Sequence, residues 1–188
     1  MKILRVDSSI KPEGSVSKQL SDEIITKLAP SEVVVRETNG IAPIDANWLG
    51  AVFTPEDQRN AQQIEIANAS DQLIAEINEA DVLVIGVPVY NFNIAAGLKN
   101  WIDQIARAGV TFRYSEAGPE GLIKGKKAIL AFSSDGTAAN SDIDFAHRYM
   151  LHILGFIGIT DVKSVIAQQM AFDRDTALKA AQEQISSL

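Results

Sequence analysis

Residues Asp81 to Val89 read DVLVIGVPV, and this apolar run decides the fold of the chain. It shows none of the apolar–polar alternation of a strand that has one face in water, so it predicts a strand buried on both faces. Such strands lie at the centre of parallel sheets whose two faces are covered by helices. The run therefore predicts the central strand of a parallel sheet.

Four more strands and five helices are predicted outward from this run. Short apolar or β-branched stretches predict strands at residues 2–7, 32–37, 126–133 and 161–167. Apolar residues at helical spacing predict helices from about Leu20 to Pro30 and over residues 55–80, 95–108, 145–154 and 173–188, whereas residues 41–47 predict a loop. The alternation predicts an α/β fold, a single domain over residues 1–188, with a doubly wound five-stranded parallel sheet and right-handed crossovers.

Composition and charge exclude several classes of function. The 188 residues are 46% hydrophobic, which fills one core, and the net charge of -7 argues against nucleic-acid binding. The absence of cysteine excludes disulfides and thiolate metal sites. No stretch reaches the apolar length of a membrane span, and Asp7 interrupts any signal-peptide hydrophobic stretch. We expect a soluble cytoplasmic protein that contacts neither nucleic acid nor membrane.

Ligands of doubly wound sheets bind beyond the carboxyl ends of the strands, near the point where the strand order reverses. Three loops follow strands at this edge and are named by their order in the chain. The first loop is residues 8–15 (SSIKPEGS), the second loop is residues 88–94 (PVYNFNI) and the third loop is residues 133–136 (SSDG). A ligand site is therefore expected among these three loops.

The first loop leads into a helix that Ser15 or Ser17 caps. Hydroxyls of Ser9, Ser15 and Ser17, free amides and the positive end of the helix dipole together suit a phosphate. Neither GxxxxGK[ST] nor GxGxxG occurs, so a mononucleotide phosphate without a metal fits better than an NTP or a dinucleotide. A capped helix behind an ordinary polar loop is the alternative.

The second loop combines asparagines with aromatic rings directly after a buried strand. Asparagine and backbone amides hydrogen-bond the edge of a planar heterocycle, while an aromatic ring covers its face. Either Tyr90 or Phe92 taken singly is explained by packing of its ring onto the core. The combination of aromatic rings with asparagines in one loop favours a ligand site. In the third loop, small residues and Gly136 allow close approach to a flat ligand, or form a simple turn.

Three long stretches carry a resemblance to a known family: Val89 to Asp103 (VYNFNIAAGLKNWID), Ala106 to Ala128 (ARAGVTFRYSEAGPEGLIKGKKA) and Leu154 to Lys163 (LGFIGITDVK). Together with the three loops, they make the chain resemble the FMN-dependent, NADH-using azoreductases over essentially its whole length. The resemblance implies a flavodoxin-like sheet of order 2-1-3-4-5 and a homodimer with one FMN per subunit, each site being completed across the interface. It also implies NADH as electron donor and a quinone or azo compound as acceptor, reduced by ping-pong hydride transfer.

The same resemblance implies roles for individual residues. The residues that bind the FMN phosphate are Ser9, Ser15, Val16 and Ser17. The residues that line the isoalloxazine are Val89, Tyr90, Asn91 and Phe92 on one side, with Ser133, Ser134, Asp135 and Gly136 on the other. The third loop departs from the family pattern Ser-Arg-Gly-Gly, and an acidic group near reduced flavin is expected to lower the flavin's potential. An apolar substrate wall is expected from Phe112, Tyr114 and Phe156, within one subunit or across the dimer, with core packing as the alternative for Phe156.

No side chain is predicted as a catalytic acid, base or nucleophile, because a flavin carries the chemistry itself. Backbone amides near Asn91 to Asn93, or at Gly136, are expected to stabilise negative charge on the reduced ring.

Three other functional classes remain as alternatives. A flavodoxin-type electron carrier is also acidic and binds FMN, and a flavin-free interaction domain would lack the colour of a flavin. A hydrolase needs a metal cluster or a Ser-His-Asp arrangement. His147 and His152 are the only histidines, their spacing does not match HExxH, and no GxSxG elbow exists. Both histidines are expected on the surface of a helix, and no metal site is expected.

Overall fold

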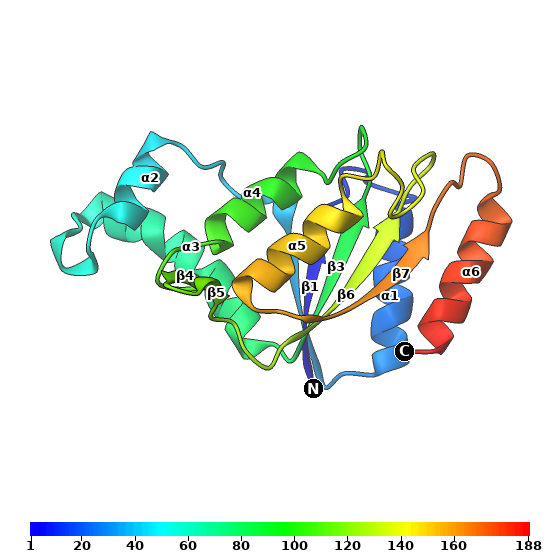
Figure 1. Cartoon of the computed structure of the whole chain (residues 1–188), viewed down its shortest axis with the longest axis horizontal. Helices are drawn as coiled ribbons and strands as arrows, with labels where there is room; N and C mark the ends of the chain where they lie inside the picture. The colour runs from blue at the N-terminus through cyan, green and yellow to red at the C-terminus, as the bar shows by residue number, and fades with distance from the viewer.

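Strand β3 (Val82–Pro88) lies at the centre of a five-stranded parallel sheet, and all seven of its residues are buried. The computed structural model describes residues 1–188 (Figure 1). The sheet also contains β1 (Lys2–Asp7), β2 (Glu32–Glu37), β6 (Lys127–Ser133) and β7 (Asp161–Ala167), in the order β2-β1-β3-β6-β7. Because β4 and β5 form a separate hairpin, this is the predicted order 2-1-3-4-5. The predicted flavodoxin-like fold is confirmed.

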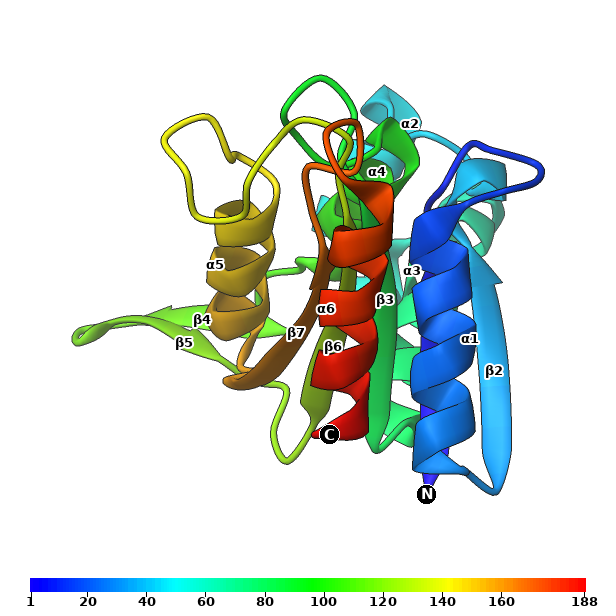
Figure 2. The same cartoon turned by 90° about the vertical axis from the view of Figure 1, so that its right-hand side faces the viewer.

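Helices cover both faces of the sheet, as predicted for a strand that is apolar throughout. On one face lie α1 (Val16–Leu28) and α6 (Arg174–Ser186), and on the other lie α3 (Ala61–Glu79), α4 (Ala96–Ile105) and α5 (His147–Ile157), as Figures 1 and 2 show. Within β3, Leu83 and Ile85 pack toward α3, α4 and α5, whereas Val82 and Val84 pack toward α1 and α6. No helix of the structure has the length and apolarity that crossing a membrane requires.

The segment between β2 and α3 differs from the prediction. Helix α2 (Ala46–Phe53) begins inside residues 41–47, where a loop is predicted, and short 3-10 turns lie on either side of it, η1 (Thr38–Gly40) and η2 (Glu56–Gln58). Helix α3 begins at Ala61 rather than near residue 55, because Asn60 and Gln63 form a reciprocal capping box there. Since α2 leaves Leu49 and Phe53 exposed, its sequence lacks the buried stripe on which helix prediction depends.

An antiparallel hairpin of β4 (Phe112–Ser115) and β5 (Gly118–Gly121) was not predicted. It projects from the body of the molecule, with its base against the carboxyl end of α5 (Figure 2). A Cβ on Gly121 would lie 2.2 Å from the backbone nitrogen of Gly158, so two glycine backbones touch at this contact. Glycine at both positions thus allows the hairpin to pack closely against the end of α5.

Candidate functional site

The three loops meet at the carboxyl ends of β1, β3 and β6, which we call the loop edge. Strand order reverses between β1 and β3, so this is the edge where doubly wound sheets bind ligands. The amide of Val89 donates to the carbonyl of Ser133 over 2.9 Å, which joins the second loop to the third. The Tyr90 hydroxyl lies 3.2 Å from Ser9 Oγ and accepts from the amide of Ile10 over 3.2 Å, which joins the second loop to the first.

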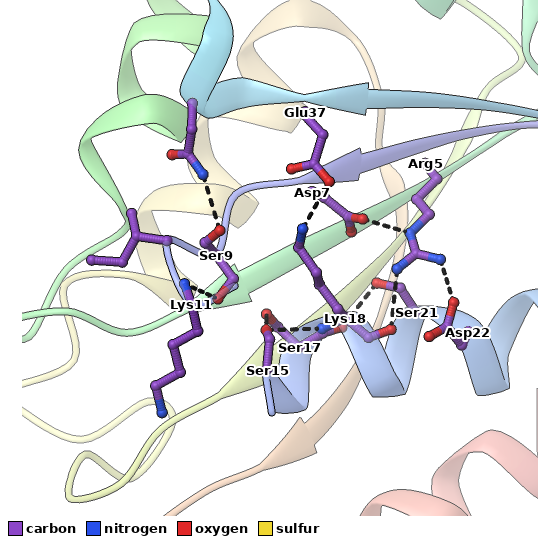
Figure 3. Close-up of polar contacts among 12 residues, drawn as sticks. Arg5, Asp7, Ser9, Lys11, Ser15, Ser17, Lys18, Ser21, Asp22 and Glu37 are labelled. Carbon is purple, nitrogen blue, oxygen red and sulfur yellow. Dashed lines mark hydrogen bonds and ion pairs between the residues drawn. The ribbon is translucent and has the colours of Figure 1, made fainter. Parts of the chain in front are cut away.

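The first turn of α1 presents an anion-binding arrangement (Figure 3). Ser15 is the N-cap, and its Oγ accepts from the amide of Lys18 over 3.4 Å and lies 3.2 Å from Ser17 Oγ. The amides of Val16 and Ser17, at the first two helical positions, have no partner inside the helix. No acidic residue occupies this turn. Hydroxyls and amides at a positive helix end therefore lie together, as a phosphate requires.

Two carboxylates near the first loop are each paired with a cation (Figure 3). Asp7 is buried at the end of β1, where its Oδ2 accepts from Arg5 Nε over 2.9 Å and its Oδ1 has no partner. Burial raises the pKa of the Asp7 carboxyl, and the Arg5 guanidinium opposes that rise. Glu37 is paired with Lys18 over 2.7 Å, whereas the Lys11 ammonium has no partner. The charges of both carboxylates are thus balanced locally.

A small cavity of about 80 Å³ lies where the three loops converge. Its walls are Ser9, Lys11, Ser15, Val16, Pro88, Val89, Tyr90, Ser133, Ser134, Asp135, Met170 and Arg174. The structure therefore brings together most of the residues predicted to bind a cofactor, from all three loops. Sequence reasoning missed Lys11 as a lining residue. It also missed Met170 and Arg174, which follow β7, because nothing in the sequence of that segment indicates a ligand.

The remaining predicted cofactor residues lie close to this cavity without lining it. Ser17 is buried directly behind Ser15, and Gly136 is exposed beside Asp135. A Cβ on Gly136 would meet no protein atom within 4 Å, so the packing of the protein itself does not require glycine there. Space beside the third loop is therefore open to a flat ligand.

The tip of the second loop has a strained backbone. Tyr90 and Asn93 exchange two backbone hydrogen bonds, of 2.9 and 3.0 Å, around Asn91 and Phe92, whose φ angles are 47° and 70°. A left-handed conformation is unusual for a bulky residue such as Phe92. Such strain costs on the order of 1–3 kcal/mol and concentrates at ligand sites. The turn thus exposes Asn91 and Phe92 at the loop edge.

A larger cavity of about 600 Å³ lies on the other side of the second loop, and Tyr90 lines both cavities. Its remaining walls are Ile10, Asn39, Asn91, Asn93, Ile94, Ala95, Ala96, Gly97, Lys99 and Tyr149. A Cβ on Gly97 would lie 2.8 Å from Asn39 Oδ1, so glycine allows the start of α4 to approach η1. Asparagines, apolar side chains and the Lys99 ammonium together suit a flat ligand with polar substituents.

The predicted substrate wall forms a cluster of its own. The Phe112 ring lies 4.5 Å from that of Phe156 and 5.7 Å from that of Tyr114, measured between centroids. These residues belong to the hairpin and the carboxyl end of α5, and none of them lines the two cavities at the loop edge. The structure thus brings the three aromatic residues to one another, but not to the loop edge of their own chain.

The prediction for His147 is wrong, because this side chain is buried rather than on a helix surface. Its Nε2 lies 2.8 Å from Ser164 Oγ and its Nδ1 lies 3.2 Å from Asn140 Oδ1. Burial lowers the pKa of the His147 imidazole, and nearby Asp144, whose carboxylate accepts from the His147 amide, opposes this. His152 is exposed, as predicted. No group of three or more carboxylate or imidazole side chains is arranged to hold a metal ion.

Comparison of the chain with protein families matches residues 1–188 to a family described as having a flavodoxin-like fold. An FMN-dependent NADH:quinone oxidoreductase 1 of Jannaschia sp. (strain CCS1) is 56% identical over 187 residues, which cover 99% of this chain and 97% of that protein. An FMN-dependent NADH:quinone oxidoreductase of Cereibacter sphaeroides (strain KD131 / KCTC 12085) is 49% identical over 191 residues, with coverage of 99% and 97%.

Solved structures give a consistent result. The crystal structure of an azoreductase from Bacillus anthracis str. Sterne superposes with a TM-score of 0.86 at 25% identity. The superposition covers 99% of this chain and 95% of the azoreductase. The similarity therefore extends over the loop edge, the helices and the hairpin alike.

Proposed function

The chain belongs to the family with the flavodoxin-like fold, and from that premise we propose that it is an FMN-dependent NADH:quinone oxidoreductase that also reduces azo compounds. The names of the similar proteins from Jannaschia and Cereibacter support the quinone activity, and the similar azoreductase supports the azo activity. The observation that carries the proposal is the convergence of all three loops on one cavity beside the free amides of Val16 and Ser17.

The residues at the loop edge suit FMN chemically. We assign its phosphate to Ser9, Ser15, Val16 and Ser17, because hydroxyls and free amides meet there without a carboxylate in the first turn of α1. The strained turn of the second loop and the open space beside Gly136 suit the two sides of a flat ring. Tyr90 positions this site by hydrogen-bonding the first loop through its hydroxyl.

Bound FMN supplies hydride transfer in a ping-pong cycle, first from NADH and then to a quinone or azo acceptor. The residues of the chain bind, orient and stabilise charge. The backbone amides of Asn91, Phe92 and Gly136, which have no partner in the protein, offer donors to negative charge on the ring, whereas the Asn93 amide, also predicted, donates to the Tyr90 carbonyl. We assign the 600 Å³ cavity beside Tyr90 to the ligand that reacts with FMN, either NADH or the quinone or azo acceptor. The acceptor groups of this ligand would bind the Asn39 and Asn93 side chains.

We further propose a homodimer in which the hairpin of one subunit completes the site of its partner. Phe53 is 76% exposed and Tyr114 is 75% exposed, and large exposed aromatic residues favour an interface. Phe112, Tyr114 and Phe156 line neither of the two cavities at the loop edge of their own chain, so a role as substrate wall requires a second subunit. A cytoplasmic location is proposed because the reaction consumes NADH.

The decisive experiment is an absorption spectrum of the purified protein, followed by anaerobic titration with NADH and then addition of a quinone. The proposal expects a flavin spectrum that NADH bleaches and quinone restores. A colourless protein that does not take up FMN contradicts it. Slow NADH oxidation by a yellow protein would instead indicate a flavodoxin-type electron carrier.

The dimer is tested separately by light scattering on the eluting protein, which should give about twice the chain mass of 20.3 kDa. A matched pair of variants then tests the hairpin: Tyr114→Ala should change the KM for quinone, while Val33→Ala, exposed on the edge strand β2, should leave it unchanged. A monomer with full quinone reductase activity contradicts completion of the site across an interface.

A further inference from the structure

Arg174 reaches the loop edge from an element that the proposed site does not otherwise use. The segment after β7 is tied to the third loop by two backbone hydrogen bonds: the amide of Met170 donates to Ser134 over 3.1 Å and that of Ala171 donates to Asp135 over 2.9 Å. Helix α6 then begins at Arg174, beside α1 on the same face of the sheet (Figure 2). Arg174 therefore lines the same small cavity as the first turn of α1.

Arg174 forms no ion pair within the protein. The carboxylates of Asp7 and Glu37 have their own cations. Among the residues lining the small cavity, Lys11 and Arg174 carry positive charge, Asp135 carries negative charge, and none of the three has an ion-pair partner. Two unpaired cations beside the free amides of Val16 and Ser17 are an arrangement that attracts a doubly charged anion.

Neither Asp173 nor Asp175, the two carboxylates at the start of α6, forms an ion pair with Arg174. Asp173 caps α6, and its Oδ1 accepts from the amide of Thr176 over 3.1 Å, so its charge is directed to the end of its own helix. Hydrogen bonds from that backbone hold the pKa of the Asp173 carboxyl below its usual range. The guanidinium thus remains free to bind an anion in the cavity.

We propose that Arg174 binds the phosphate of FMN, as a cation supplied from α6 opposite the hydroxyls and amides of the first loop and α1. The proposal rests on FMN being the cofactor. The third loop has no cation of its own and contributes Asp135 instead, so the positive charge at this side of the cavity comes from Arg174. A guanidinium matches phosphate geometry because two of its N–H groups donate in parallel.

The test compares FMN with riboflavin, which lacks the phosphate, by fluorescence titration of the flavin-stripped full-length protein. Arg174→Gln should weaken FMN binding about tenfold or more, as expected for the loss of a charged hydrogen bond, and leave riboflavin binding unchanged. Arg174→Lys should restore part of the loss. The matched control is Lys179→Gln, which removes the same charge from an exposed position of the same helix, outside the cavity.

A second arm separates binding of the phosphate from neutralisation of Asp135. If Arg174 binds the phosphate, Arg174→Gln should weaken FMN binding equally in an Asp135→Asn background. Loss of the effect in that background overturns the proposal, because Arg174 would then act only on Asp135. A rise in the KM for NADH without a change in FMN affinity also overturns it, because it would assign Arg174 to the dinucleotide.

The remaining outcomes distinguish this inference from the proposed function. If the parent protein binds FMN and Arg174→Gln binds it equally well, only the assignment of Arg174 fails. If Arg174→Gln weakens FMN and riboflavin equally, the residue has a structural role and the assignment fails as well. If the parent protein binds no FMN, the proposed function fails first.

Discussion

At the loop edge, hydroxyls and backbone amides are fixed by hydrogen bonds between loops, such as the contact of Tyr90 with Ser9. At the base of the hairpin, by contrast, two glycine backbones touch and three aromatic rings cluster beside them, without a polar side chain at the contact between Gly121 and Gly158. Side chains at the loop edge are therefore available to a ligand. At the base of the hairpin, the close contact of Gly121 with Gly158 requires that neither residue has a side chain. Substitutions at the loop edge should therefore change the binding and potential of the flavin, whereas substitutions at the base of the hairpin should change the free energy of unfolding.

The largest effect is expected at the loop edge. Replacing Ser9 and Ser17 together with alanine removes two hydroxyls from the proposed phosphate site, and each hydrogen bond to a charged group is worth about 1.5–3 kcal/mol. FMN affinity should fall about a hundredfold or more, measured by fluorescence titration. The control is Ser21→Ala on the same helix, whose Oγ donates to the Ser17 carbonyl. If the double variant binds FMN as tightly as the parent, the serines of the first loop only cap the helix and do not bind the phosphate.

The second prediction concerns the stability of the hairpin. Gly121→Ala places a Cβ against the backbone of Gly158, and overpacking of this kind costs about 1–3 kcal/mol. The free energy of unfolding, from urea denaturation, should fall by that amount while FMN affinity is retained. Gly155→Ala in α5 is the control, because its Cβ would meet no atom within 4 Å. A Gly121→Ala protein as stable as the parent contradicts the glycine contact.

The third prediction returns to the loop edge and concerns Asp135. This exposed carboxylate should disfavour negative charge on a reduced flavin, so Asp135→Gly and Asp135→Asn should both raise the two-electron potential. The rise should be about 10–30 mV, since 30 mV corresponds to about 1.4 kcal/mol for two electrons. Spectroelectrochemical titration measures it, with Asp142→Asn as an exposed control outside the cavity. Potentials equal to that of the parent would remove Asp135 from the tuning of the flavin.

The smallest effect is expected at His147, near the end of α5 that faces the third loop. Its pKa is lowered by burial, so folding favours the neutral imidazole, and acid favours the unfolded chain. The free energy of unfolding should therefore fall as the pH drops below the unfolded value of about 6.5, by at most about 1.4 kcal/mol per pH unit. His147→Gln should flatten this slope between pH 7.5 and 5.5, and His152→Gln, which is exposed, should not. Equal slopes for all three proteins contradict a buried neutral His147.

The sheet and the first two loops were predictable because their signals are local. A strand buried on both faces needs consecutive apolar residues, and DVLVIGVPV supplies them in β3. A helix that starts at an anion site needs a hydroxyl cap, and Ser15 supplies it. The order of strands followed from the family resemblance, whereas the placement of the three loops at one sheet edge followed from the parallel direction of the strands.

Helix α2, the hairpin and the burial of His147 were not predictable by the same reasoning. Helix α2 leaves Phe53 exposed, and the hairpin packs through Gly121, so neither shows a hydrophobic period. The burial of His147 depends on Ser164 of β7, which is distant in sequence. These features depend on which segments, distant in sequence, come into contact in the folded protein.

By itself, therefore, the sequence determined the parallel sheet, the capped first loop and the aromatic second loop, because each depends on neighbouring residues along the chain. Only the tertiary structure decided that Arg174 joins Ser15 and Asp135 in one cavity, and that Phe112, Tyr114 and Phe156 lie apart from it. The physical reason is that a crossover brings the ends of distant strands to one edge, and no local pattern records which charges meet there.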